Sequence, residues 1–208
     1  MKKYLIFDLD GTLIQSNSSI NTIIYSYISE HLWEEYVDHA KYVIENNQWM
    51  SVKEGFDILL NWDKQQVEKH SKEVTRQINQ ISGKIVFFPN VVEKIKELST
   101  KYTLFISTGN SDEFAWDILS SAWIDICFDK ILWSSYILKS PQHIDEFIDF
   151  TWDPELPQKA IYIWDGQRDK LIANKKNIDF IHIWTSWKEK YQIKSVDLID
   201  EVLKKIDK

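Results

Sequence analysis

Three groups of polar side chains each follow a short apolar stretch of the chain, and their residue types could support catalysis. Short apolar stretches of this kind are typical of buried strands. The carboxyl ends of neighbouring parallel strands meet at one edge of a sheet, where ligands bind in open α/β folds. We therefore expect the three groups to converge on one site. They are Asp8 with Asp10 after residues 3–7, Ser107 with Thr108 after residues 102–106, and Asp165 with Asp169 after residues 160–164.

Asp8 and Asp10 form the pair with the clearest chemical consequence. In an extended chain, side chains two residues apart point the same way, so these two carboxylates would repel each other. A hard divalent cation would relieve the repulsion, and so would a proton shared for acid–base work. Gly11 and Thr12 follow directly, and a glycine there lets backbone N–H groups approach an oxyanion or a phosphate. The complete string 7–13 favours a functional site over a simple turn with a capping aspartate.

The elements that would position these groups alternate along the chain between short apolar stretches and amphipathic helical ones. This alternation predicts an α/β fold with a Rossmann-like, doubly wound parallel sheet that helices cover on both faces. Strands are expected at residues 3–7, 102–106, 160–164 and 179–184, with short strand-like pieces at 126–128 and 130–132, and helices at 91–98, 112–121, 143–151, 169–176 and 196–206.

A long helical stretch interrupts this alternation after the first strand. Apolar residues recur there at helical spacing, for example at Ile20, Ile24 and Ile28, and the pattern predicts three to five helices and no strand. We therefore expect an inserted all-helical domain at residues 16–84. The core domain would comprise residues 1–15 and 85–208.

The string Phe7-Asp8-Leu9-Asp10-Gly11-Thr12-Leu13 resembles the first motif of the haloacid dehalogenase superfamily of phosphohydrolases. The likeness is to the subgroup with a helical cap, which includes phosphoglycolate phosphatases. Three later motifs of the family match in order: Ser107 at the end of a strand, Lys139 before Pro141, and the pair Asp165 and Asp169. The resemblance covers nearly the whole chain and implies that the inserted helical domain is the cap.

The resemblance assigns a role to each motif residue. It implies that Asp8 attacks phosphorus and forms an aspartyl-phosphate, and that Asp10 protonates the leaving oxygen and then activates water. Lys139 would offset the negative charge of the nucleophile and of the transition state. Mg²⁺ would be the cofactor, held by the metal site Asp8, Asp10 (through its backbone carbonyl), Asp165 and Asp169. The phosphate would be bound by Gly11, Thr12, Ser107, Thr108 and Gly109.

These roles imply a Mg²⁺-dependent phosphatase that hydrolyses a small phosphomonoester. Asp10 favours ester hydrolysis over dehalogenation or phosphonate cleavage, because those branches of the family lack an aspartate at this position. A phosphomutase or phosphotransferase would carry the same residues, and a catalytically silent protein that binds a phosphorylated ligand is a further alternative.

Composition narrows the choice of partners. The net charge of −7, from 25 basic and 32 acidic residues, argues against a nucleic-acid binder, and we expect a small phosphorylated metabolite instead. A single cysteine fits a reducing, cytoplasmic location. No apolar stretch approaches the length of a membrane span, so no membrane partner is expected. The sequence predicts no oligomeric state.

Tryptophan and glycine occur in unusual numbers. The chain has ten Trp and five Gly, whereas a usage of about 7% would give roughly 15 Gly. Several Trp stand where turns or glycines are expected, and they include Trp123, Trp133, Trp152 and Trp164. One hypothesis is that many of them are glycines in the natural protein, from a source that reads the codon UGA as Gly. The alternative is a protein that is rich in tryptophan.

Overall fold

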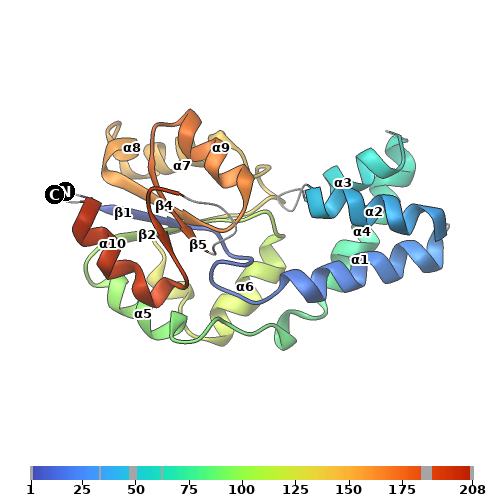
Figure 1. The fold of residues 1–208 in the computed structure, drawn as a ribbon, viewed down its shortest axis with the longest axis horizontal. Coiled ribbons are helices and arrows are strands. Elements are labelled where there is room, and N and C mark those ends of the chain that lie inside the picture. Colours follow the sequence, from blue (N-terminus) through green and yellow to red (C-terminus); the bar gives the residue numbers. More distant parts are fainter. Residues whose placement is uncertain (1, 33, 47–50, 62, 184–188, 207–208) are drawn as a thin grey trace.

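The sheet is the centre of the fold. The computed structural model describes residues 2–32, 34–46, 51–61, 63–183 and 189–206. Its strands are β1 Tyr4–Phe7, β2 Thr103–Ser107, β3 Lys130–Leu132, β4 Ala160–Trp164, β5 Asp179–Ile183 and β6 Gln192–Ile193. They form one parallel sheet in the order β3-β2-β1-β4-β5-β6 (Figure 1). Because β1 lies between β2 and β4, the carboxyl ends of these three strands are neighbours.

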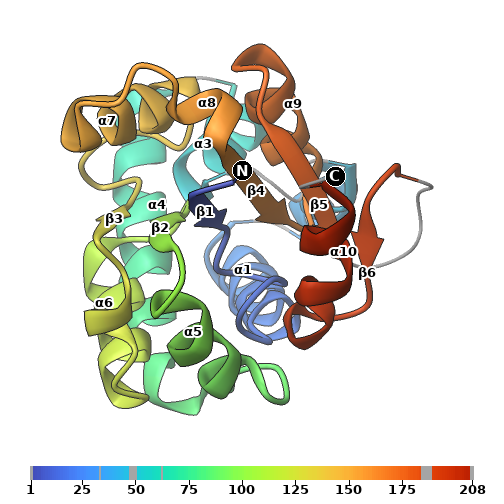
Figure 2. The same ribbon diagram turned by 90° about the vertical axis from the view of Figure 1, so that its left-hand side faces the viewer.

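Helices cover both faces of the sheet. They are α5 Val91–Ser99, α6 Asp112–Ser121, α7 Pro141–Thr151, α8 Leu156–Lys159, α9 Gln167–Lys175 and α10 Ile199–Ile206. Alternate strand residues face opposite sides, so Leu5 and Phe7 belong to one buried cluster while Tyr4 and Ile6 belong to the other. Figure 2 shows α7, α8 and α9 on one side of the sheet and α5, α6 and α10 on the other. The predicted doubly wound, Rossmann-like fold is confirmed.

Four helices between β1 and α5 form a separate group beside the sheet (Figure 1). They are α1 Asn17–His31, α2 Glu34–Asn46, α3 Val52–Leu59 and α4 Lys64–Asn79. Tyr27 and Phe56 are buried where α1 and α3 meet, with their rings edge to face. Ser51 and Glu54 form a capping box that fixes the start of α3. This group is the inserted helical cap, although its predicted limits of 16–84 remain a prediction.

A few elements differ from the expected ones. Residues 125–127 form a 3₁₀ helix instead of a strand, and Ile126 is 82% exposed, so its apolar side chain does not mark a buried strand. Another 3₁₀ helix, Val196–Leu198, precedes α10 where one continuous helix was expected. The strand β6 and the short helix α8 were not predicted, and both are too short for periodicity to reveal. Trp184, at the predicted end of β5, lies outside the described residues.

Two tryptophans occupy backbone conformations that glycine favours. Trp123 has φ 56° and Trp152 has φ 53°, and their side chains are 76% and 91% exposed. Side chains with a Cβ rarely adopt positive φ, so this finding supports the glycine hypothesis at these two positions. Trp164 is different, because it lies in the extended strand β4 and is fully buried.

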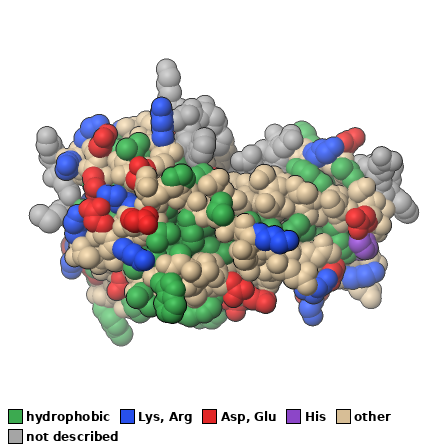
Figure 3. Space-filling model, turned by 90° about the horizontal axis from the view of Figure 1, so that it is seen from below, with side chains coloured by type: hydrophobic (Ala, Val, Ile, Leu, Met, Phe, Trp, Pro, Cys, Tyr) green, Lys and Arg blue, Asp and Glu red, His purple; other side chains and the backbone are tan. Residues whose placement is uncertain are grey.

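The surface and the helix lengths give two further observations. On the face drawn in Figure 3, the acidic and basic side chains of the described residues are interspersed over both parts of the molecule. No helix within the described ranges is long and apolar enough to cross a membrane.

Candidate active site

Asp8 is placed at the carboxyl end of β1 and is almost fully buried. Its Oδ1 accepts hydrogen bonds from the backbone N–H of Leu9 at 2.8 Å and from the ammonium group of Lys139 at 2.7 Å. Lys139 lies just before α7, which begins at Pro141 after the N-cap Ser140. The side chain of Lys139 therefore reaches Asp8 across the ends of the strands.

Asp10 points into the same cavity but has different partners. Ser16 donates its hydroxyl hydrogen to Oδ1 of Asp10, and the side-chain amide of Asn110 donates to Oδ2. Neither of these groups carries a charge. The two carboxylates that are adjacent in the sequence pattern thus have distinct environments, since Asp8 is bound by a cation and Asp10 by neutral donors.

Gly11 allows the loop after β1 to lie directly against Asp165. It has φ +67°, and a Cβ placed on it would lie 1.9 Å from Oδ2 of Asp165. Its N–H donates to the backbone carbonyl of Ile14 at 2.9 Å. The hydroxyl of Thr12 lies 3.4 Å from Oδ1 of Asp165. Gly11 and Thr12, predicted at the phosphate, are therefore placed against the acidic side of the site.

Asp169 lies in the first turn of α9 and completes the acidic group. Lys139 donates to its carboxylate at 2.8 Å, so this one ammonium group joins Asp8 and Asp169. The hydroxyl of Tyr162, from β4, lies 2.5 Å from Oδ1 of Asp169 and 2.9 Å from Oγ of Ser107. Its single hydrogen can go to either acceptor, and the hydroxyl thus links Asp169 to Ser107.

Ser107 and Thr108 lie beneath the cavity instead of lining it. Both are fully buried. The hydroxyl of Ser107 contacts Tyr162 and, at 2.9 Å, Nδ1 of His143. Thr108 accepts a hydrogen bond from the backbone N–H of Asn110 at 3.1 Å. The next two residues, Gly109 and Asn110, do line the cavity. Of the three residues after β2 that were predicted to bind phosphate, only Gly109 therefore lines the cavity.

Burial and mutual repulsion shift the ionisation of the acidic group. Burial raises the pKa of Asp8 well above its ordinary value, which Lys139 opposes and the neighbouring aspartates reinforce. Burial also raises the pKa of Asp10, against the hydrogen bonds from Ser16 and Asn110. The pKa of Asp165 rises to about 7 through burial and the charge of Asp169.

For Lys139, the neighbouring charges outweigh the effect of burial on its pKa. Burial alone would lower its pKa, but the carboxylates of Asp169 and Asp8 raise the pKa above its ordinary value. The ammonium group therefore stays charged. Four carboxylates, those of Asp8, Asp10, Asp165 and Asp169, share this single lysine in the cavity. The site has an excess of negative charge that a bound cation would neutralise.

Comparison with known proteins decides the family. The sequence model of the family described as haloacid dehalogenase-like hydrolase matches residues 5–183. The chain belongs to the haloacid dehalogenase-like hydrolase family. The resemblance read from the motifs is confirmed, and the chain is assigned to a family of hydrolases. None of the curated proteins matches the sequence.

Solved structures show the same fold at low sequence identity. A candidate haloacid dehalogenase-like hydrolase from Bacteroides fragilis has a TM-score of 0.81 at 20% identity, over 96% of this chain and 100% of that one. A candidate phosphoglycolate phosphatase from Lactobacillus plantarum has a TM-score of 0.79 at 16% identity, over 97% and 100%. A hydrolase of this family from Bacillus subtilis, described as bound to magnesium and as showing interdomain movement, has a TM-score of 0.66 at 14% identity, over 97% and 98%.

The donor set of this hydrolase suits a hard divalent cation. Carboxylate oxygens are the ligands that Mg²⁺ prefers, and four aspartates line the cavity beside the ammonium group of Lys139. In the described part of the chain, no three Asp, Glu, His or Cys side chains are gathered as a ready chelating group. Asp8, Asp10, Asp165 and Asp169 could hold the ion together with water.

Several residues that hold the site were not foreseen from the sequence. Asn110 carried a signal, because it directly follows the strand-end group at Ser107. Tyr162 did not, since it lies inside an apolar strand and reads as a core residue. Arg168 and Glu54 link the core to the cap, where the guanidinium donates to both carboxylate oxygens at 2.8 and 3.1 Å. Such a pair depends on tertiary structure alone.

The site lies in a cavity between the core and the cap. The cavity has a volume of about 150 Å³ and is bounded by the strand-end residues on one side and by helices α1 to α4 on the other. A single water requires roughly 10–15 Å³ by this measure, so a small organic molecule has room. Trp164 does not line the cavity, because its ring packs against Phe180 and His182 with centroids 5.5 and 4.6 Å away. The bulky side chain of Trp164 therefore lies away from the cavity.

Proposed function

We propose that this chain is a Mg²⁺-dependent phosphatase that hydrolyses small phosphomonoesters through an aspartyl-phosphate on Asp8. The observation that carries the proposal is that Asp8 and Asp10 have different hydrogen-bond partners. Asp8 is held by the cation Lys139, whereas Asp10 is held by the neutral donors Ser16 and Asn110. Two carboxylates in unlike environments are what a nucleophile and a general acid require.

In the first step, the carboxylate of Asp8 attacks phosphorus and the bond from phosphorus to the ester oxygen breaks. Asp10 gives its proton to the departing alkoxide, and its raised pKa favours the protonated form that this step needs. Lys139 offsets the negative charge on Asp8 and on the transferring phosphoryl group.

In the second step, the Asp10 carboxylate accepts a proton from a water molecule. The resulting hydroxide attacks phosphorus, the bond from phosphorus to Asp8 breaks, and inorganic phosphate leaves. Bound Mg²⁺ would supply charge neutralisation for the phosphoryl oxygens, and Asp8, Asp10, Asp165 and Asp169 are the residues that would hold it. Gly109 lines the cavity, and its N–H could donate to a phosphoryl oxygen.

The test is release of inorganic phosphate from p-nitrophenyl phosphate with and without Mg²⁺. We expect turnover that needs Mg²⁺, and Asp8→Asn should abolish it because the amide is a poor nucleophile. Asp149→Asn is the matched control, since Asp149 is exposed on α7, outside the cavity. Unchanged turnover in Asp8→Asn would refute the assignment.

An acid-quenched sample supplies the second measurement. Intact mass should show one added phosphoryl group on the wild-type chain during turnover and none on Asp8→Asn. A phosphotransferase would move the group to an added alcohol instead of releasing phosphate, and a silent binding protein would show neither product.

A further inference from the structure

The cap side of the active-site cavity differs in character from the strand-end side. Its lining residues include Ile20 and Ile24 of α1, Val52, Phe56 and Leu59 of α3, and Ile78 of α4. These are aliphatic or aromatic side chains. Phe56, Leu59 and Ile78 are almost fully buried, so the apolar wall is fixed by the packing of the cap.

Polar groups on the cap side are few and uncharged. Asn17 and Asn21 line the cavity from the first turns of α1. Ser51 also lines it, but its hydroxyl lies 2.8 Å from the carboxylate of Glu54 in the capping box. A neutral hydroxyl on a ligand could be bound by the two asparagines, whereas a negative charge would find no cation there.

Among the residues that the structure describes, the cations near the cavity are already paired. Lys139 is the one Lys, Arg or His among the described lining residues, and it is bound to Asp8 and Asp169. Arg168, at the rim, is bound at both carboxylate oxygens of Glu54. A carboxylate entering this cavity would therefore meet four aspartates and an apolar wall.

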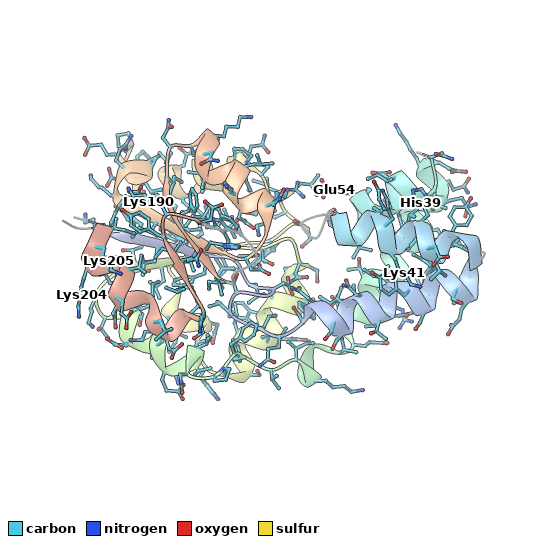
Figure 4. The ribbon with its side chains drawn as sticks, viewed as in Figure 1. His39, Lys41, Glu54, Lys190, Lys204 and Lys205 are labelled. Atoms are coloured by element: carbon cyan, nitrogen blue, oxygen red, sulfur yellow. The ribbon has the colours of Figure 1, made fainter. Side chains whose placement is uncertain are left out.

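Other cations of the cap lie elsewhere. Lys53 pairs with Glu68 at 2.8 Å and is mostly exposed. Figure 4 shows His39 and Lys41 on the part of the cap away from the core, whereas Glu54 lies on the side that faces the core. The cap segments outside the described residues, 33, 47–50 and 62, contain no Lys, Arg or His.

From this lining we infer that the substrate is the phosphate ester of an uncharged, mainly apolar alcohol, and that esters carrying a carboxylate near the phosphate are rejected. The inference rests on the proposed function and adds the chemical class of the leaving group. An apolar group is favoured by burial against the isoleucines, Phe56 and Leu59, whereas a buried carboxylate without a partner loses its hydration uncompensated. The cap thus selects by the charge of the alcohol.

An isosteric pair of substrates tests this selection. In 3-methylbutyl phosphate an isopropyl group occupies the place that a carboxylate occupies in 3-(phosphonooxy)propanoate, so size is matched and charge is not. With Mg²⁺ present, we expect kcat/KM for the apolar ester to be higher by at least about 100-fold, because the charged analogue leaves a buried group unpaired. Equal values, or a preference for the carboxylate, would overturn the inference.

Acetyl phosphate separates this failure from failure of the proposed function. Its small acyl group demands little of the cap wall, so its hydrolysis reports on the acidic site alone. If acetyl phosphate is hydrolysed while the charged ester is preferred over the apolar one, the phosphatase proposal stands and the substrate class is wrong. If none of the three compounds is hydrolysed, both proposals fall.

A cation placed on the apolar wall should weaken the preference for the apolar ester. Ile24→Lys puts an ammonium group into the cavity, and we expect the ratio of the two kcat/KM values to fall by about tenfold or more. Ile24→Met controls for loss of the branched side chain, and Thr22→Lys controls for added charge, because Thr22 is exposed on the same helix. Both controls should keep the wild-type ratio. A ratio that Ile24→Lys leaves unchanged would count against the inference, and the wild-type comparison remains decisive if this variant fails to fold.

Discussion

The guanidinium of Arg168 and the carboxylate of Glu54 join the core to the cap through two hydrogen bonds of 2.8 and 3.1 Å. Arg168 lies one residue before Asp169, and Glu54 closes the capping box at the start of α3. The cap is also tied to α6 by Asn79 of α4, whose amide donates to Glu113 at 2.6 Å. The position of the cap over the cavity is thus coupled to the start of α9, which carries Asp169.

We predict that Arg168→Ala weakens closure of the cap and lowers kcat/KM. Paired, partly buried charges in two-point contact contribute on the order of 1–2 kcal/mol, so the loss should be about tenfold, measured by steady-state kinetics with a fixed substrate. Lys53→Ala is the matched control. Lys53 lies on α3, the helix that carries Glu54, and the variant removes only the exposed ion pair of Lys53 with Glu68 of α4. Glu54→Gln should give a loss similar to that of Arg168→Ala, and the double variant should lose no more than either, which a double-mutant cycle would show. Fully additive effects would contradict the coupling.

Gly11 gives a prediction about the close packing of the loop after β1 against Asp165. Gly11→Ala places a Cβ 1.9 Å from the carboxylate of Asp165 at a φ of +67°, so either the loop after β1 or Asp165 must move. We expect the free energy of unfolding to fall by roughly 2 kcal/mol and activity to be lost, as urea unfolding and phosphate release would measure. Gly83→Ala is the control, since nothing lies within 4 Å of the added atom. Full activity in Gly11→Ala would show that the close approach is not needed.

The acidic site was predictable from the sequence because its signals are local. Asp8 and Asp165 directly follow apolar strands, Asp10 and Asp169 come a few residues later, and parallel pairing brings strand ends together whatever the side chains are. The family resemblance predicted Ser107 at the phosphate, whereas in the structure its hydroxyl contacts Tyr162 and His143. Successive side chains of a strand face opposite sides, so the direction of one residue at a strand end depends on register that sequence alone does not give.

Contacts between distant segments were not predictable. Tyr162 reads as one more apolar strand residue until its hydroxyl is seen beside Asp169. Arg168 and Glu54 are 114 residues apart in the sequence. From the sequence alone, each could equally be a solvent-exposed charged residue on the surface of a helix. The apolar lining of the cap cavity is a similar case, because helical periodicity identifies buried faces without showing which helix each one meets.

His143 predicts a dependence of stability on pH. Burial lowers its pKa to about 4, so the folded chain keeps the imidazole neutral, with Nδ1 beside Ser107 and Nε2 beside the carbonyl of Ile137. An unfolded histidine has a pKa of about 6.5. The contribution of His143 to the free energy of unfolding is therefore fully present above that pH and is lost as the pH falls from 6.5 to 4. The free energy of unfolding should decrease over this range by up to about 3 kcal/mol through this residue alone.

The contribution of His143 can be isolated by comparison with a variant. His143→Gln removes the titration while keeping an amide in place of the Nε2 donor, so the difference in unfolding free energy between the two proteins should narrow as the pH falls from 6.5 to 4. Urea unfolding at several pH values measures it, and subtraction cancels the titration of the acidic site. His39→Gln, on the exposed surface of α2, should run parallel to the wild type. Parallel curves for His143→Gln would contradict the prediction.

The tryptophan hypothesis predicts opposite effects of one substitution at different sites. Trp123→Gly and Trp152→Gly should each raise the free energy of unfolding by about 1 kcal/mol, because glycine adopts positive φ without the penalty that Trp incurs. Trp116→Gly is the control, since Trp116 is also exposed but lies inside α6, where glycine should lower stability by about 0.5 kcal/mol. Urea unfolding of the three variants measures these changes. A loss of stability at all three positions would contradict the idea that glycine suits residues 123 and 152.

Two further measurements test the glycine hypothesis: the stability of a Trp164 variant and the intact mass of the natural protein. The ring of Trp164 is fully buried between Phe180 and His182, so Trp164→Gly should lower the free energy of unfolding by about 3–5 kcal/mol. Its indole N–H nevertheless donates to no acceptor in the described part of the chain, and a buried unpaired donor is unfavourable. The intact mass of the protein from its own source distinguishes the two sequences, because each Trp replaced by Gly lowers it. A mass that matches ten tryptophans would show that the positive φ values of Trp123 and Trp152 are carried by tryptophan itself.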